Sequence, residues 1–206
     1  MRLTLLSITP NAEQLIESAG RTAYQSFEKQ GPNSEKKFIK MLIKLGHLSV
    51  LEHAWATIRI EGISRALTHQ LVRHRLCSFT QKSQRYVNEK DFHYITPPSI
   101  ALNPMTKKIF DDFMDHAKEI YLELQKFGIR NEDARFVLPN SIESEIVVTA
   151  NFREWRHIIK LRGRPSAQWE IRELAIELLK ILKKYAPIVF EDLEIDEKER
   201  KIIELT

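Results

Sequence analysis

One basic stretch lies near the middle of the chain, Arg73-His74-Arg75-Leu76-Cys77-Ser78-Phe79-Thr80-Gln81-Lys82-Ser83-Gln84-Arg85-Tyr86. An apolar-periodic run over residues 63–72 precedes it and predicts a helix whose last turn holds Arg73 to Arg75. No aspartate or glutamate occurs from Gly62 to Asn88, and this window carries five cations in a chain whose net charge is only +4. A concentrated positive site at the end of a helix predicts a place to bind an anion.

Short polar residues follow this predicted helix at every second position. If the segment is extended, Gln81, Ser83 and Arg85 project from one side and form a row of hydrogen-bond donors. The guanidinium is a planar fork that suits phosphate. The alternative is a solvated helix terminus whose arginines complement the helix dipole. The alternation and the absence of acids favour the binding site.

A second window without acids runs from Trp155 to Trp169. Arg153 and His157 share a face of the predicted helix there, because they are four residues apart. Arg162 stands at the end of this helix, next to Gly163. It could bind a ligand, or it could simply satisfy the last helix carbonyls.

The composition is that of a globular protein, with 206 residues, 43% hydrophobic and 29% charged. This length predicts one domain over residues 1–206. The single cysteine, Cys77, excludes an internal disulfide and indicates a cytoplasmic protein. No apolar run reaches the ~20 residues that cross a bilayer, so we expect no membrane partner.

The order of elements predicts an α+β fold, a small, mainly antiparallel sheet packed with long helices. Strands are expected at residues 3–8, 54–61 and 145–149, with a short one at 94–96. Helices are expected at residues 9–24, 34–46, 63–72, 103–127, 131–138, 151–162 and from 166 onward. Asn151 followed by Glu154 is a capping-box pattern. The acidic tail over residues 191–206 is expected to be a solvated helix or a frayed end.

Other kinds of site have little support. The histidines lack metal-ligand spacing, so we expect no metal site. No two glycines lie two residues apart, which excludes the dinucleotide and phosphate-loop fingerprints. Nearby cations could lower the pKa of Cys77, but a buried structural thiol is the better interpretation.

Five ordered blocks of the sequence resemble the flavin-dependent thymidylate synthase family. Arg73-His74-Arg75, then seven residues and Ser83, is similar to the signature of that family. The other blocks that resemble it are Gly46 to His53, Ala134 to Pro139, Asn151 to Arg162 and Ala167 to Arg172. Two positions differ from some members, since Gln81 replaces a glutamate and His157 an asparagine.

The resemblance implies a reaction and a set of site residues. dUMP would be methylated at C5 from 5,10-methylenetetrahydrofolate, with FAD reduced by NADPH as the hydride source. It implies a homotetramer whose active sites combine several subunits. Independently of the resemblance, no nucleic-acid-binding motif occurs in the sequence, so we expect no nucleic-acid partner. Residues that resemble FAD contacts are Ser49, Arg73, His74, Arg75, Gln81, Asn151, Arg153 and His157. Residues that resemble dUMP contacts are Gln70, Arg73, Gln81, Ser83, Gln84, Arg85, Arg135 and Arg162.

The chemistry of the residues agrees with this reaction. A fixed cation near the pyrimidine carbonyls favours the form of the ring that attacks through C5, and Arg162 can be that cation. His47 matches a family histidine near the flavin and folate, so Arg162 and His47 are the expected catalytic residues. Ser83 is interpreted as a ligand hydroxyl rather than a nucleophile.

Two other classes of function remain open from the sequence. Windows rich in arginine, with Phe79, Tyr86 and Trp155 nearby, could bind single-stranded nucleic acid by charge and stacking. A purely structural oligomer is a third possibility, but it leaves the five ordered blocks unexplained.

Overall fold

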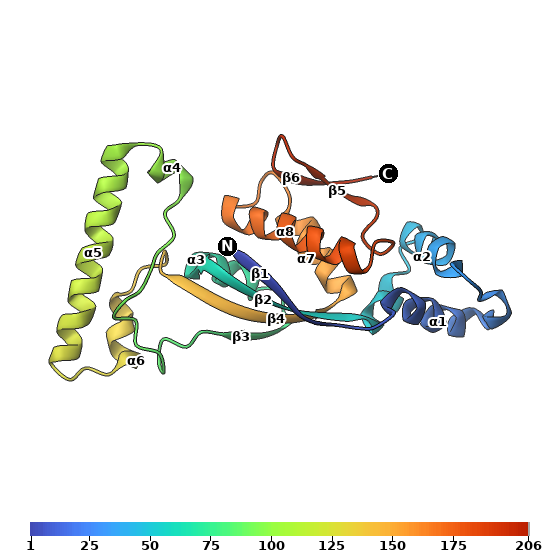
Figure 1. Cartoon of the computed structure of the whole chain (residues 1–206), viewed down its shortest axis with the longest axis horizontal. Helices are drawn as coiled ribbons and strands as arrows, with labels where there is room; N and C mark the ends of the chain where they lie inside the picture. The colour runs from blue at the N-terminus through green and yellow to red at the C-terminus, as the bar shows by residue number, and fades with distance from the viewer. Residues whose placement is uncertain (206) are drawn as a thin grey trace. The chain divides into compact units, whose positions relative to one another are not determined.

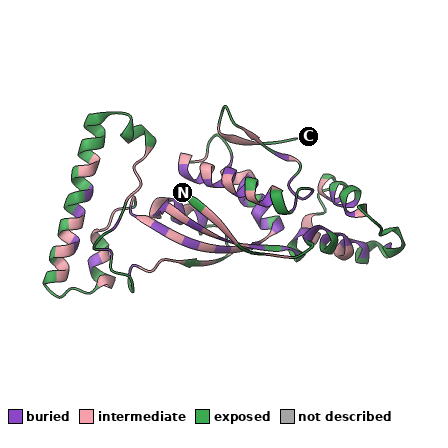
Figure 2. Cartoon of the chain, viewed as in Figure 1, coloured by how far each residue is buried: buried purple, intermediate pink, exposed green. Residues whose placement is uncertain are grey.

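Strand β4, Glu143–Asn151, shows how the alternating sequence pattern builds the sheet. Its residues alternate between intermediate and buried along the whole strand, with Ile146, Val148 and Ala150 on the buried face. Figure 2 shows this alternation as bands along the strand. Branched and small apolar side chains at every second position favour a strand with one face against a core. Strand β2, Trp55–Ser64, shows the same alternation over Ala56, Ile58 and Ile60.

The computed structural model describes residues 1–205 and has the expected α+β fold. One sheet has the strand order β1-β2-β4-β3, and β5 pairs antiparallel with β6 (Figure 1). The remaining strands are β1 Arg2–Ile8, β3 Ser78–Gln81, β5 Leu193–Asp196 and β6 Lys201–Glu204. The helices are α1 Ala12–Tyr24, α2 Ser34–Lys44, α3 Arg65–Leu71, α4 Pro98–Ala101, α5 Pro104–Lys126, α6 Asn131–Ala134, α7 Phe152–Arg162 and α8 Trp169–Tyr185, with 3-10 turns η1 Phe27–Lys29, η2 Leu48–His53 and η3 Arg135–Val137.

The chain divides into two compact units, and the boundaries between them fall inside individual strands and inside one helix. Unit 1 comprises Met1–Arg2, Ile60–Gln70 and Thr80–Ile146. Unit 2 comprises Leu3–Arg59, Leu71–Phe79 and, of the described chain, residues 147–205. The single domain over residues 1–206 stays a prediction.

Unit 2 holds helices α1, α2, α7 and α8, and its core gathers where α7 and α8 pack together. The Trp155 ring on α7 is fully buried, and its indole N–H donates to the Ala56 carbonyl on β2 at 3.1 Å. Arg156 forms a two-pronged ion pair with Asp192, which ties α7 to the chain that follows α8. These contacts fix α7 as a rigid support for the side chains on its exposed face.

Unit 1 contains α5, the longest helix, with α4 and α6 packed against it. Asn103 caps α5 by accepting from the Met105 amide, and Pro104 occupies the first turn. The buried side chains of Phe92, Met114 and Ile142 form a small core in this unit. The expected strand at residues 94–96 is only an isolated bridge from Tyr94 to Ile142.

Three expectations about local structure were wrong. Helix α1 begins at Ala12 rather than near Pro10, because Asn11 adopts a left-handed conformation just before it. Strand β2 continues through Gly62, whose φ of +69° suits glycine, so Ile63 and Ser64 belong to the strand. The acidic tail is not a helix but the β5–β6 hairpin, with Leu193 fully buried.

Candidate functional site

The Arg73-His74-Arg75 motif lies in a turn after α3 rather than in the last turn of a helix. Helix α3 ends at Leu71, and the His74 amide donates to the Leu71 carbonyl at 3.1 Å. The Cys77 amide then donates to the His74 carbonyl at 3.2 Å. Two successive turns therefore meet at His74. Its side chain is buried, whereas those of Arg73 and Arg75 are exposed.

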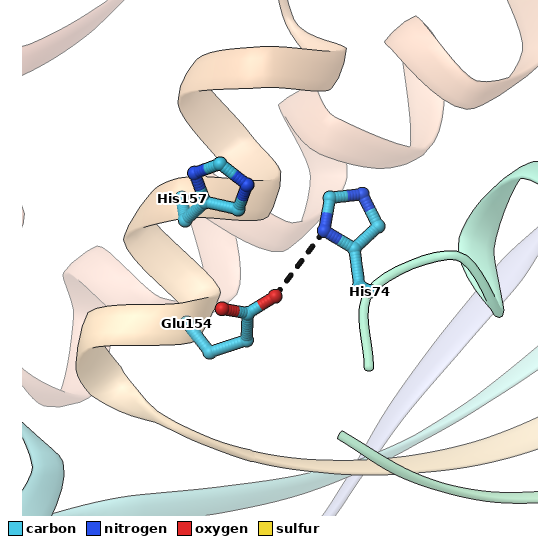
Figure 3. Close-up of side chains that lie close together, drawn as sticks. All are labelled: His74, Glu154 and His157. Atoms are coloured by element: carbon cyan, nitrogen blue, oxygen red, sulfur yellow. Dashed lines mark hydrogen bonds and ion pairs between the residues drawn. The ribbon is translucent and has the colours of Figure 1, made fainter. Parts of the chain in front are cut away.

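Helix α7 begins as the sequence predicted. The Asn151 side-chain oxygen accepts from the Glu154 amide at 2.8 Å and satisfies one of the free N–H groups at the helix start. The second half of the capping box was wrong, because the Glu154 carboxylate does not return to the cap. Its Oε1 lies 3.2 Å from Nδ1 of His74 (Figure 3).

His74 is held from both sides. Nε of Arg162 donates to Nε2 of His74 at 3.0 Å, while Nδ1 faces Glu154. Since Nε of an arginine always carries a hydrogen, Nε2 of His74 must be the acceptor. A neutral His74 then carries its proton on Nδ1 and donates it to Glu154. The motif and the C-terminal arginine, far apart in sequence, are thus joined through one imidazole.

Burial sets the protonation states of this cluster. Burial, then Arg162, then His157 lower the pKa of His74 from 6.5 to about 4, so the ring is neutral at pH 7. The contact between His74 and Glu154 is therefore a hydrogen bond rather than a salt bridge at neutral pH. Burial raises the pKa of Glu154, and the same effect with a contribution from Glu154 raises the pKa of Cys77 to about 12. The Cys77 thiol is thus unreactive at neutral pH.

His74, Glu154 and His157 could each offer an atom to a metal ion, because these atoms lie within 4.8 Å of one another. Figure 3 shows His157 and Glu154 projecting from the same side of α7 toward His74. The two imidazole rings meet edge to face, with centroids 5.4 Å apart. Both ring nitrogens of His74 already have partners, and one partner is a guanidinium that a dication would oppose. The arrangement therefore suits hydrogen bonding better than metal binding.

A cavity of about 700 Å³ adjoins this cluster in unit 2. Leu48, Trp55, Leu76 and Leu161 give it apolar walls, and its cations are Arg153, Arg156, Lys160 and Arg164, with Asn151, Glu52, Glu154 and His157 also lining it. Arg153 pairs with Glu52 at the surface. Apolar walls with convergent polar groups are typical of a pocket for a small ligand or cofactor. Arg156 and Lys160 are also paired, with Asp192 and Glu204, so a bound anionic group would compete with these ion pairs.

The other expected residues of unit 2 lie at its surface. Ser49 and His47 are exposed, and Nδ1 of His47 lies 3.1 Å from the Tyr24 hydroxyl. Neither lines the 700 Å³ cavity. The structure therefore places Asn151, Arg153 and His157 together at the cavity, and leaves the role of Ser49 and His47 a prediction.

The expected dUMP residues other than Arg73 and Arg162 belong to unit 1. The extended donor row is not formed, because β3 ends at Gln81 and a turn follows it. The Ser83 hydroxyl accepts from the amides of Arg85 and Tyr86, at 3.2 and 3.4 Å, which places it at the start of this turn. Gln81 donates to the hydroxyls of Thr68 and Ser144.

The two expected dUMP cations of unit 1 contact residues of the same unit. Nε of Arg85 lies 2.6 Å from Glu132. Arg135 donates through Nε to the Glu132 carbonyl at 3.0 Å. Gln84 is buried, and Gln70 is partly buried on α3. Arg85 and Arg135 therefore both contact Glu132, one at its carboxylate and the other at its backbone carbonyl.

Sequence reasoning missed two residues. Glu154 was assigned to helix capping, and only its three-dimensional position beside His74 shows another role. Arg65 was counted only as one of the cations in the acid-free window. Burial, then repulsion from Arg135, lowers its pKa, so these two guanidinium groups lie close enough to interact. A pair of neighbouring cations was not foreseeable from positions so far apart in sequence.

Within the described residues 1–205, no helix combines the length and apolar character needed to span a membrane. Residues 4–188 match the family model described as thymidylate synthase complementing protein.

Curated relatives match nearly the whole chain. The flavin-dependent thymidylate synthase of Geobacter sulfurreducens is 43% identical over 200 residues, covering 93% of this chain and 86% of the relative. Those of Corynebacterium diphtheriae and Mycobacterium tuberculosis are 40% and 42% identical, covering 91% and 88% of this chain and 81% and 79% of the relatives. These matches give no support to the nucleic-acid-binding alternative. The chain belongs to the thymidylate synthase complementing protein family, that of the flavin-dependent thymidylate synthases.

Proposed function

We propose that this protein is a flavin-dependent thymidylate synthase that converts dUMP to dTMP. The carbon donor is 5,10-methylenetetrahydrofolate, which leaves as tetrahydrofolate, and NADPH is the reductant. The observation that carries this proposal is the hydrogen bond from Arg162 to His74. It joins two of the sequence blocks that resemble the family into one preorganised cluster.

The cavity of unit 2 suits FAD. Its volume of about 700 Å³ lies within the range of small-molecule pockets. Its apolar walls can accept flat rings, and Arg153 with Lys160 and Arg164 can face a diphosphate. When bound, FAD reduced by NADPH supplies the hydride of the reaction. We assign Arg73, His74, Arg75, Asn151, Arg153 and His157 to hold it, with Ser49 and Gln81 as further contacts.

Arg162 has the properties needed to activate a pyrimidine. Burial lowers the pKa of its guanidinium, but an arginine stays charged at neutral pH. Its hydrogen bond to the neutral His74 directs the side chain without cancelling its charge. A fixed cation beside the ring carbonyls of dUMP would stabilise the negative charge that develops as C5 becomes nucleophilic. The resemblance also implies that His47 would lie near the flavin and the folate.

The donors of unit 1 would bind the nucleotide. Gln70, Gln81, Ser83, Gln84, Arg85 and Arg135 are the proposed dUMP contacts, together with Arg73 and Arg162. Arginines and hydroxyls of this kind bind phosphate and sugar by charge-assisted hydrogen bonds. Ser83 acts here as a ligand, because its hydroxyl already organises the turn that carries Arg85. We also propose a cytoplasmic homotetramer with active sites shared between subunits.

The purified protein tests this proposal directly. It should be yellow or take up FAD on incubation, and it should form dTMP from dUMP only when 5,10-methylenetetrahydrofolate and NADPH are both present. Addition of dUMP should accelerate the oxidation of NADPH. A protein that takes up no FAD and forms no dTMP would contradict the proposal. Binding of oligonucleotides with a steep salt dependence would instead support a nucleic-acid module.

A further inference from the structure

We propose that Glu154 is a positioning residue that fixes the tautomer of His74 and thereby the orientation of Arg162. The proposal rests on the proposed function, because Arg162 is the residue assigned there to activate dUMP. Glu154 is buried, with 6% of its surface exposed, and its carboxylate points at Nδ1 of His74 (Figure 3).

The Glu154 carboxylate does not complete the capping box of α7. A glutamate at the third position of a helix usually serves the capping box. Here Asn151 already satisfies the Glu154 amide, while the Glu154 carboxylate turns to a histidine that lies 80 residues away in sequence. Burying a carboxylate is costly unless it makes hydrogen bonds. The position of this one is therefore best explained by its contact with His74.

The contact with Arg162 fixes which nitrogen of His74 carries the proton. Nε of Arg162 can only donate, so the contact at 3.0 Å requires a lone pair on Nε2 of His74. The proton of the neutral ring must then be on Nδ1, and an acceptor must lie opposite it. Glu154 Oε1 is that acceptor at 3.2 Å. The tautomer of a histidine is generally set by the partner of its other nitrogen.

Removal of the Glu154 carboxylate would change the hydrogen bonding of His74. Without Glu154, the N–H at Nδ1 would be buried with no partner from α7, and the ring would gain by moving its proton to Nε2. That N–H would then oppose Nε–H of Arg162, and the hydrogen bond to His74 that helps to direct the guanidinium would be lost. Charged or titratable groups of the cluster also shift one another's pKa values: His157 acts on His74, Arg153 on Glu154, and Glu154 on Cys77. Of these groups, Glu154 makes the hydrogen bond to Nδ1 of His74.

Two variants of Glu154 separate the effect of its hydrogen-bond acceptor from the effect of its size. Glu154→Ala removes the acceptor, whereas Glu154→Gln keeps an oxygen of similar reach. At saturating dUMP we expect kcat for dTMP formation to fall about tenfold in Glu154→Ala and to stay within about threefold in Glu154→Gln. The matched control is Glu13→Ala, which removes another buried carboxylate of unit 2 that accepts from the amides of Ile188 and Val189. Its kcat should not change.

A second measurement does not depend on activity. Nitrogen-15 spectra of histidine-labelled protein report which ring nitrogen carries hydrogen, and His74 is assigned by the signal missing in His74→Gln. We expect Nδ1–H at His74 in the wild type and loss of this tautomer in Glu154→Ala.

Three outcomes would overturn the proposal: Nε2–H at His74 in the wild type, an unchanged kcat in Glu154→Ala, or equal losses in the Ala and Gln variants. If Glu154→Ala does not fold, the wild-type spectrum and the Gln variant decide. A wild type that makes no dTMP would refute the proposed function, while the spectrum would still test the role of Glu154.

Discussion

The cluster around His74 in unit 2 and the turn around Ser83 in unit 1 differ in how their polar groups are held. In unit 2, buried His74 links Glu154 and Arg162 by hydrogen bonds on both ring nitrogens. In unit 1, Arg85 is exposed and pairs with Glu132 at the surface. A buried, fully bonded cluster keeps its geometry before a ligand arrives, whereas an exposed ion pair must exchange partners when one binds. We infer that unit 2 supplies the fixed charge for chemistry and unit 1 supplies affinity.

The largest effect should come from removing the fixed cation. Arg162→Ala should lower kcat for dTMP formation by about 100-fold or more, because a preorganised charge at the reacting ring is lost. Steady-state rates at saturating dUMP measure it. Lys180→Ala, on the surface of α8 in the same unit, should leave kcat unchanged. A wild-type kcat in Arg162→Ala would contradict the assignment of the activating charge to unit 2.

The next effect concerns stability in acid. The pKa of His74 is about 4 in the folded chain against 6.5 as the ordinary value, so the unfolded chain binds a proton in this interval that the folded chain does not. Stability is therefore lost as pH falls from about 6.5 to 4, by up to about 3 kcal/mol from this group. The raised pKa of Glu154 acts in the opposite direction. Urea unfolding of the wild type and His74→Gln at pH 7 and pH 4.5 isolates the histidine.

In that experiment, the wild type should lose more stability on acidification than His74→Gln. His53→Gln, which changes an exposed histidine of the same unit, should behave as the wild type. Equal acid sensitivity of the wild type and His74→Gln would mean that His74 is not buried in its neutral form.

A smaller effect is expected at the turn of unit 1. Ser83→Ala removes an acceptor from the amides of Arg85 and Tyr86, which loosens the turn. We expect KM for dUMP to rise several-fold, roughly the effect of one hydrogen bond, with measurable turnover retained. Initial rates across dUMP concentrations separate KM from kcat. Complete loss of turnover with dUMP and FAD still bound would instead support a nucleophilic serine.

The smallest effect tests whether the surface ion pair competes with the nucleotide. Glu132→Gln removes the charge that engages Arg85 and should lower KM for dUMP by about twofold, in line with the modest strength of exposed pairs. Asp112→Asn, which alters an exposed ion pair on α5, is the matched control. A rise in KM would show that Glu132 helps to position Arg85 rather than competing for it.

Local signals in the sequence predicted much of the fold. Helix α7 was foreseen with its bounds and its Asn151 cap, and the α+β class was foreseen from the order of elements. These features depend on residues close in sequence, where propensity and capping act directly. The apolar run over residues 63–72 was less reliable, because periodicity could not show that its first residues extend β2.

Contacts between distant segments could not be predicted in this way. The β5–β6 hairpin was missed because its acidic sequence hides the burial of Leu193. The pairing of His74 with Glu154 spans 80 residues, and a strong local pattern pointed to capping instead. The resemblance supplied the expected ligands, but only the structure shows how Arg162 is oriented.

The most direct test of the different roles of the two units compares Arg162→Ala with Arg85→Ala in one assay. This assay measures the rate of dTMP formation as dUMP is raised to saturation, which gives kcat. Arg85→Ala should require more dUMP but regain the wild-type kcat, since it loses only binding. Arg162→Ala should stay about 100-fold slow however much dUMP is added. Recovery of the wild-type kcat by Arg162→Ala, or a permanent loss of kcat in Arg85→Ala, would contradict the assignment of chemistry to unit 2 and affinity to unit 1.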